Sequence, residues 1–299
     1  MAESGWLWIV FTILAAAGQT IRNAAQRELT VTLGTVGATH VRFLFGFPFA
    51  VIFLLGLMLA TGASLPKPPP IFWAWIIDGM GAQIVATALM LAAMGERSFV
   101  VTIAYIKTEP VQVALFGLIF LGDTLSPGMV AAILIATAGV VVMSLKPGGM
   151  PSDSWRPTLL GLASGAMFAL SAVGYRGAIL SLNLPDYIMA ATYTLTVGLL
   201  LQSVLLSIYL MLCSPDVMRA IVKAWRPSLF AGFMGATASQ FWFLAFALAT
   251  AASVRTLALV EVLFAQAIST FAFGQKTSAR EGLGIVLIVI GVVLLIWTH

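Results

Sequence analysis

The feature that most constrains this chain is a series of long apolar runs without a charged residue. Residues 127–145, 187–212 and 282–298 are such runs, and each has about the length, roughly 20 residues, that a helix needs to cross a bilayer core. Apolar residues make up 61% of the 299 residues and charged residues 9%, whereas a soluble domain is about 25% charged. The runs are continuous and do not alternate, which favours helices over the strands of a membrane barrel. We therefore predict an all-α membrane protein.

Proline and glycine divide the sequence into ten candidate transmembrane helices. Clear breaks occur at L-P-K-P-P-P (65–70), L-S-P-G (125–128), K-P-G-G-M-P (146–151), N-L-P (183–185) and W-R-P (225–227). The predicted helices are 6–25, 34–60, 72–93, 98–120, 127–145, 157–180, 187–212, 228–249, 253–274 and 281–298. The longest connection, about 213–227, is short, so no soluble domain is expected and a transporter or channel is favoured.

The second half of the sequence repeats features of the first. An offset of 152 places Glu109 on Glu261, Gly122 on Gly274, Ser126 on Ser278 and Gly139 on Gly291. A repeat of five helices, an odd number, requires the second copy to enter the membrane from the opposite side. We therefore predict two inverted five-helix repeats, residues 1–149 and 150–299, with a substrate site near the membrane midplane between them.

The distribution of basic residues predicts the orientation. Nine Lys and Arg residues lie in the connections after odd-numbered helices, and the opposite side has Lys67, with Arg176 and Arg255 near helix ends. The positive-inside rule then places the odd connections in the cytoplasm and both termini outside. The net charge of +4 fits basic loops facing an anionic leaflet, so we expect a bilayer and no nucleic acid as the partner. The N-terminus has no basic segment before the first apolar run, so that helix is expected to be retained, and the single cysteine, Cys213, excludes an internal disulfide.

A small set of costly residues lies within the predicted helices. A charged side chain inside a membrane costs on the order of a few kcal/mol, so each such residue is a candidate for function. The charged candidates are Arg42, Asp78, Lys107, Glu109 and Glu261, and their polar or amphipathic neighbours include His40, Gln83, Tyr105, Gln240 and Trp242.

The densest group lies in Y-I-K-T-E-P-V-Q, residues 105–112. Tyr105, Glu109 and Gln112 have the spacing i, i+4, i+7 and share one helical face, which predicts a protein interior or a wet cavity. Lys107 is about 200° around the helix from Glu109, so the two do not face each other in a regular helix. Pro110 removes one backbone hydrogen bond, frees the carbonyl of Ile106, and predicts a kink that could turn Lys107 toward the cavity.

Each candidate also has a purely structural interpretation. Glu109 and Glu261 could line one cavity or only hold neighbouring helices together, and Lys107 could bind a substrate or pair with Glu109, Glu261 or Asp78. His40 and Arg42 could lie at a cavity mouth, although a lone membrane histidine more often bonds a neighbouring helix. Trp242 is a candidate for a cavity wall, whereas the G-x-x-x-G of residues 161–165 is interpreted as helix packing.

The end of each repeat resembles the drug/metabolite transporter superfamily, specifically its EamA branch. The resemblance rests on T-E-P-V-Q-V-A-L-F-G-L-I-F-L-G-D-T-L-S-P followed by A-G-V-V-V-M, and on V-E-V-L-F-A-Q-A-I-S-T-F-A-F-G-Q-K-T-S followed by I-G-V-V-L-L. The family has an acid before the last helix of each repeat, which is Asp123 here in the first repeat but Gln275 in the second. The second repeat also has Val262 in place of the proline.

The resemblance implies a multi-pass secondary transporter of a bacterial inner membrane that works by alternating access. Few basic residues lie deep within the predicted membrane helices, which disfavours a phosphorylated substrate and favours a neutral zwitterion. We expect export of small neutral or aromatic amino acids, with Lys107 facing the carboxylate and Glu109 or Glu261 the ammonium. Gln83, Tyr105, Gln240 and Trp242 would shape a pocket between the third, fourth, eighth and ninth helices. Coupling to protons and facilitated diffusion both stay open.

The expected partner is a small-molecule substrate, bound by a monomer without a metal or other cofactor. No Walker A sequence, H-E-x-x-H motif or Cys/His cluster occurs in the sequence, so we do not expect an enzyme. Two alternatives remain: a multidrug exporter of lipophilic cations, and a subunit of a membrane enzyme or lipid flippase.

Overall fold

The structure is a computed structural model that describes residues 5–96, 105–144, 156–264, 266 and 278–298. Within these residues the regular structure is helical and no strand occurs, as the sequence predicted. In this described part of the chain, six helices are long and apolar enough to cross a membrane: Val36–Thr61, Pro70–Met90, Thr158–Ser181, Tyr187–Cys213, Trp225–Leu248 and Ala279–Thr298. Leu7–Arg22, Glu109–Leu121 and Pro127–Met143 are shorter apolar helices. The chain is therefore an all-helical protein of the membrane type.

The elements are α1 (Leu7–Thr61), α2 (Pro70–Glu96), α4 (Glu109–Phe116), the π-helix η1 (Gly117–Leu121), α5 (Pro127–Ser144), α6 (Arg156–Ser181), α7 (Tyr187–Cys213), α8 (Pro215–Lys223), α9 (Trp225–Leu248), α10 (Ala251–Leu257) and α12 (Ala279–Thr298). Most follow the predicted segments to within a few residues. The element α1 contains the two predicted helices 6–25 and 34–60, which meet at a kink where the backbone of Gly34 is not helical (φ 66°, ψ 179°). The fourth and ninth predicted helices extend beyond the described residues at 98–104 and 267–274.

Local sequence sets the helix ends. Pro70, Pro127 and Pro215 each begin a helix, where a missing N–H costs no hydrogen bond. At the start of α12, the Ser278 hydroxyl accepts from the Glu281 backbone and the Glu281 carboxylate accepts from the Ser278 backbone, at 3.3 and 2.7 Å. Gly62 ends α1 in the left-handed conformation that glycine adopts most readily.

The chain folds into two compact units that each combine distant segments. Unit 1 contains residues 1–81 and 174–248, and unit 2 contains residues 82–173 and 249–299. The helices α2 and α6 therefore contribute one part to each unit. Each unit takes helices from both predicted repeats, so the compact units are not the same division of the chain as 1–149 and 150–299, whose boundary lies outside the described residues.

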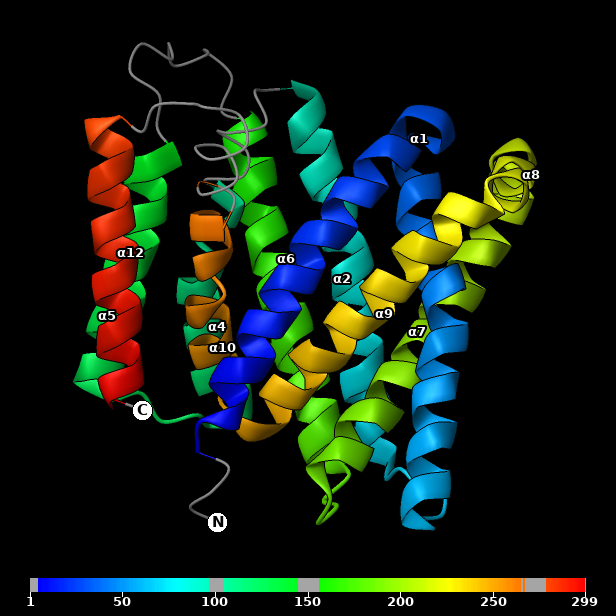
Figure 1. Cartoon of the computed structure of the whole chain (residues 1–299), viewed down its shortest axis with the longest axis horizontal. Coiled ribbons are helices and arrows are strands. Elements are labelled where there is room, and N and C mark those ends of the chain that lie inside the picture. Colours follow the sequence, from blue (N-terminus) through cyan, green and yellow to red (C-terminus); the bar gives the residue numbers. More distant parts are fainter. Residues whose placement is uncertain (1–4, 97–104, 145–155, 265, 267–277, 299) are drawn as a thin grey trace. The chain divides into compact units, whose positions relative to one another are not determined.

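In unit 1, α9 lies alongside α1, and α7 packs against both (Figure 1). Small residues allow the close approach: a Cβ at Gly18 would lie 3.2 Å from Ala238 Cβ, and one at Gly232 would lie 2.5 Å from the Phe45 carbonyl carbon. A short amphipathic helix, α8, follows α7 in the segment predicted as a plain connection, and its Ile221 is buried among Leu29, Leu33 and Val41. Unit 1 thus combines close glycine and alanine contacts between α1 and α9 with a cluster of larger apolar side chains under α8.

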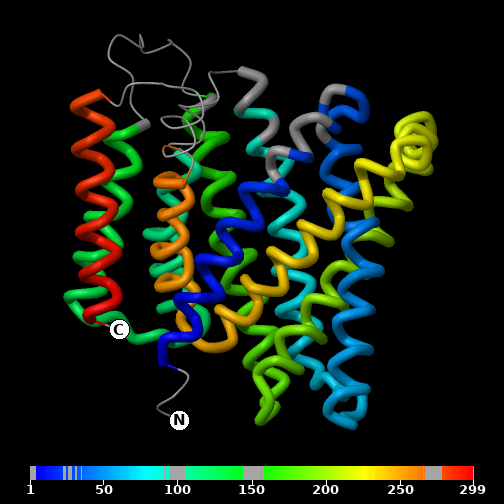
Figure 2. The backbone as a smooth tube through the Cα atoms, viewed as in Figure 1, coloured from blue at the N-terminus to red at the C-terminus, as the bar shows by residue number. Residues whose placement is uncertain are grey.

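In unit 2, α5 and α12 run side by side with their backbones nearly in contact (Figure 2). A Cβ at Gly139 would lie 2.8 Å from the Gly284 oxygen, and one at Gly291 would lie 2.6 Å from the Ala136 nitrogen. Gly139 and Gly291 are the pair that the offset of 152 superposes, so the matched glycines occupy the same helix crossing.

Candidate functional site

Four charged side chains form two ion pairs in unit 2. The Lys107 ammonium donates to the Glu261 carboxylate over 3.2 Å, and the Arg255 Nε lies 3.1 Å from Glu109 Oε1. The second pair has the distance of an ion pair but not the alignment of a hydrogen bond. The side chains are between 12% and 20% exposed, so both pairs are largely removed from solvent. We call Lys107, Glu109, Arg255 and Glu261 the charge quartet.

Two helix interruptions position the charge quartet. The helical path breaks at Lys107–Thr108, and α4 then begins at Glu109 with Pro110 in its first turn. It breaks again at Ala258–Leu259, after α10, and helix resumes at Val260, directly before Glu261. Both breaks use bonds to the third preceding residue: Thr108 to Tyr105 and Val111 to Thr108 in one, Leu259 to Thr256 and Val262 to Leu259 in the other.

The second break has no proline: Val262 occupies the position equivalent to Pro110. Pro110 is therefore compatible with the interruption, but a proline is not needed to produce one in this fold. In each case the break lies just before a glutamate, so the glutamate is in the first turn of the helix that follows.

The face predicted for Tyr105, Glu109 and Gln112 packs partly against α6. A Cβ at Gly161 would lie 2.8 Å from Tyr105 Cβ, and one at Gly165 would lie 3.1 Å from Gln112 Oε1 and 3.2 Å from the Ile106 oxygen. The Gln112 amide also donates to the Leu162 carbonyl over 3.4 Å. The two glycines of the G-x-x-x-G thus give the broken helix room to approach, in agreement with the packing interpretation.

Each ion pair joins a residue of the first predicted repeat to a residue of the second. Glu109 and Glu261, the superposed glutamates, do not pair with neighbours in their own segment: Glu109 takes Arg255 from α10, and Glu261 takes Lys107 from the segment before α4. Lys107 and Glu109 do not pair with each other, as their angular separation predicted. Arg255 was not among the predicted site residues, because only its position near a helix end was visible in the sequence.

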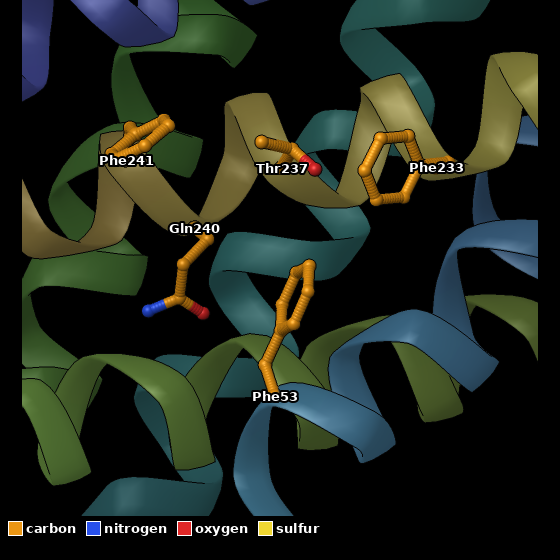
Figure 3. Close-up of a pocket in the computed structure, with 5 residues that line it drawn as sticks. All are labelled: Phe53, Phe233, Thr237, Gln240 and Phe241. Atoms are coloured by element: carbon orange, nitrogen blue, oxygen red, sulfur yellow. The ribbon is translucent and has the colours of Figure 1, made fainter. Parts of the chain in front are cut away.

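Gln240 and Trp242 lie on different sides of α9 in unit 1. The Gln240 amide donates to the Thr192 hydroxyl over 2.8 Å, and Gln240 lines a cavity of about 270 Å³ with Phe53, Phe233, Thr237 and Phe241 (Figure 3). The Trp242 indole donates to Gln19 Oε1 over 3.2 Å and is buried. Phe241, not Trp242, contributes the aromatic wall on this part of α9.

The remaining predicted residues in unit 1 have separate surroundings. His40 is buried and shares a 3.0 Å hydrogen bond with Ser207, which is the helix-to-helix contact considered for it. The stems of Arg42 and Arg22 both lie against Gly235, since a Cβ there would be 3.3 and 3.4 Å from them. Asp78 is exposed, with its carboxylate beside Gly174, where a Cβ would lie 2.6 Å from Oδ2.

The structure therefore divides the predicted residues between the units. Unit 2 holds Lys107, Glu109, Glu261, Tyr105 and Gln83, and unit 1 holds His40, Arg42, Asp78, Gln240 and Trp242. The first three of these take part in two ion pairs, Lys107 with Glu261 and Glu109 with Arg255. Among the described residues, no three His, Cys, Asp or Glu side chains are grouped as a metal site would require.

Comparison with known proteins defines the fold but not a family. A solved structure described as "Crystal structure of protein" superposes with a TM-score of 0.74, covering 98% of this chain and 96% of that chain at 16% sequence identity. At this identity the match shows a shared fold alone. No family model and no curated protein matches the chain. The class established here is a helical protein with several helices suited to a membrane.

Proposed function

We propose that the protein is a secondary transporter that exports small neutral or aromatic amino acids by alternating access across a bacterial inner membrane. The observation that carries this proposal is the charge quartet, two largely buried ion pairs in a chain in which charged residues make up 9%. Such groups are costly in a membrane and are retained where they pair or bind a ligand.

The balance of charge in the quartet favours a zwitterionic substrate. Lys107 and Arg255 offset Glu109 and Glu261, so the cluster is formally neutral. An amino acid is also neutral overall, with one ammonium and one carboxylate. It can insert between Lys107 and Glu261, so that one ion pair is replaced by two and no charge is left unpaired. A phosphate or a simple cation in the same place would leave a charge unpaired.

The helix breaks support the same interpretation. Broken helices in transporters place backbone groups and helix ends beside the substrate, where intact helices would keep their polar groups bonded internally. Here a break precedes each of the two superposed glutamates. The superposed glycines at the α5–α12 crossing add support for the ten-helix, inverted-repeat arrangement that we include in the proposal. Termini on the outside follow from the distribution of basic residues.

A multidrug exporter of lipophilic cations is less well supported. Such a substrate needs a carboxylate available to it, and both glutamates of the quartet have a basic partner within 3.2 Å. A cation would have to displace Lys107 or Arg255 and leave that residue without its anion, which is unfavourable away from water.

The test is counterflow in proteoliposomes with a labelled neutral amino acid and a panel of unlabelled ones. Exchange should be selective in the wild type and reduced at least about tenfold in Lys107→Met, Glu109→Gln and Glu261→Gln, consistent with the loss of one charge-assisted contact of about 1.5–3 kcal/mol. Asp216→Asn is the matched control, since it removes an anion from the exposed Asp216–Arg219 pair of α8. Exchange with no amino acid in the panel would refute the proposal.

A charge-swapped variant separates binding from structure. The double substitution Lys107→Glu with Glu261→Lys allows an ion pair to re-form between the same two positions. If the pair only holds helices together, the swapped protein should fold and transport. If the two charges face the two ends of an amino acid, it should fold but lose transport, because each end then meets the wrong sign.

A further inference from the structure

The short helix α8 carries exposed basic side chains directly after the membrane-length helix α7. We infer that α8 and the start of α9 form a binding site for the headgroup of an anionic phospholipid, with Arg219, Lys223 and Arg226 as its cations. Figure 1 shows α8 end-on, whereas α7 and α9 are seen along their length, so α8 lies across the direction of both. The inference concerns unit 1 alone and does not rest on the proposed function.

The inner face of α8 is fixed to α1. Ile221 is fully buried in a cluster with Leu29 and Leu33 of α1. Val217 lies so near α1 that a Cβ at Gly37 would be 2.8 Å from its Cγ1. Val217 and Ile221 are four residues apart and share one helical face. Because this face packs against α1, the opposite face of α8 is held outward.

The outward face of α8 has more positive than negative charge. Arg219 and Lys223 are exposed, and each is two residues from Ile221, about 200° around the helix from it. The acid of α8, Asp216, pairs with Arg219 over 2.9 Å, and these side chains are 88% and 74% exposed. Among the described residues, Lys223 has no carboxylate within ion-pair distance. This face therefore offers a cation that no acid of the protein neutralises.

Arg226 adds a third cation in the first turn of α9. Its guanidinium carbon lies 5.4 Å from the centroid of the Trp225 ring, which holds it beside the junction of α8 and α9. The positive end of a helix dipole favours an anion at this position, and the first turn of α9 contains no acidic residue. A phosphate bound there would offset both the charge of Arg226 and the dipole of α9.

The apolar side chains around these cations favour a lipid as the source of the anion. Val222 and Trp225, on either side of Lys223 in the sequence, are 63% and 50% exposed, and Leu212 at the end of α7 is 79% exposed. Exposed tryptophan and basic residues together are typical of helices at the level of the lipid headgroups. A soluble anion would leave the apolar side chains in water. A phospholipid meets the cations with its phosphate and the apolar side chains with its acyl chains.

The test uses Cys213, the exposed single cysteine next to α8, as a local probe. The full-length protein carries a fluorophore on Cys213 in phosphatidylcholine nanodiscs that contain a small fraction of nitroxide-labelled phosphatidylglycerol or nitroxide-labelled phosphatidylcholine. Short-range quenching then measures how often each lipid lies beside α8. Wild type should prefer phosphatidylglycerol by about tenfold or more, because each basic residue near an anionic headgroup contributes roughly fivefold.

Substitutions on the outward face predict changes in both directions. Arg219→Gln, Lys223→Gln and Arg226→Gln should each lower the preference by about 3- to 5-fold, and the triple variant should abolish it. Asp216→Asn should raise the preference, since it releases Arg219 from its pair. The control is Lys67→Gln, which removes an exposed cation from the connection between α1 and α2 and should leave the preference unchanged.

Three results would overturn the inference. One is equal quenching by the two labelled lipids in the wild type, and another is a preference that survives in the triple variant. The third is a preference that disappears when inorganic phosphate is added at constant ionic strength, because the cations would then bind free phosphate and not a lipid headgroup.

Discussion

Removing one partner of the Lys107–Glu261 pair should destabilise the protein far more than removing both. The pair has a 3.2 Å separation, and its side chains are 20% and 15% exposed, so removal of either partner would deprive a largely buried charge of its opposite charge. Breaking a fully buried pair costs about 3–5 kcal/mol, and a discount for the remaining exposure gives about 2–3 kcal/mol for Lys107→Met or for Glu261→Gln. The double variant leaves no unpaired charge and should lie within about 1 kcal/mol of wild type.

Thermal unfolding of the purified protein, followed by intrinsic tryptophan fluorescence, measures these differences. At about 2–4 °C per kcal/mol, each single variant should lower Tm by roughly 4–12 °C, and the double variant should recover most of the loss. The resulting double-mutant cycle should give a coupling energy of about 2 kcal/mol or more. Arg219→Ala, in the exposed pair of α8, should change stability by no more than about 1 kcal/mol. Additive losses, with the double variant worse than either single one, would refute the reasoning.

Two further predictions use the glycines and the single cysteine. Gly291→Val should destabilise the protein by about 1–3 kcal/mol in the same unfolding assay, because its Cβ would lie 2.6 Å from the Ala136 nitrogen. Gly282→Val is the control and should be close to neutral, since a Cβ at Gly282 meets nothing within 4 Å. Equal effects of the two substitutions would contradict the α5–α12 packing. Cys213 is exposed at the end of α7, on the side predicted to be cytoplasmic. A membrane-impermeant maleimide should therefore label it in inside-out vesicles and not in right-side-out vesicles. The reverse result would invert the predicted orientation.

The helices were predictable because their limits depend on local chemistry. Apolar length, with proline or glycine at the boundary, fixed the extents of α2, α5, α6, α7, α9 and α12 to within a few residues. The amphipathic α8 was missed because only membrane-length apolar segments were sought. The two parts of α1 were predicted as separate helices, and the non-helical backbone of Gly34 (φ 66°, ψ 179°) is where they meet.

The site was predictable only in part, because its geometry depends on tertiary contacts. The cost of burying charge singled out Lys107, Glu109 and Glu261, whereas the choice of Glu109, Glu261 or Asp78 as the partner of Lys107 stayed open until the tertiary contacts were known. The partnership of Glu109 with Arg255, 146 positions apart, has no local signal. Gln240 and Trp242 lie on different sides of α9 for the same reason that separates Lys107 from Glu109: residues two apart lie about 200° apart on a helix.

The interleaved composition of the two units has a consequence for biosynthesis. Residues 1–81 leave the ribosome long before residues 174–248, with which they form unit 1. At about 5–20 residues per second, α1 must wait roughly 10–30 s for α9, its main packing partner. During that interval its glycine-lined surface is inserted but uncovered. A chain that terminates before residue 225 never makes this contact. Premature release should therefore yield an incomplete assembly intermediate, and not a functional unit, that membrane quality-control proteases can recognise.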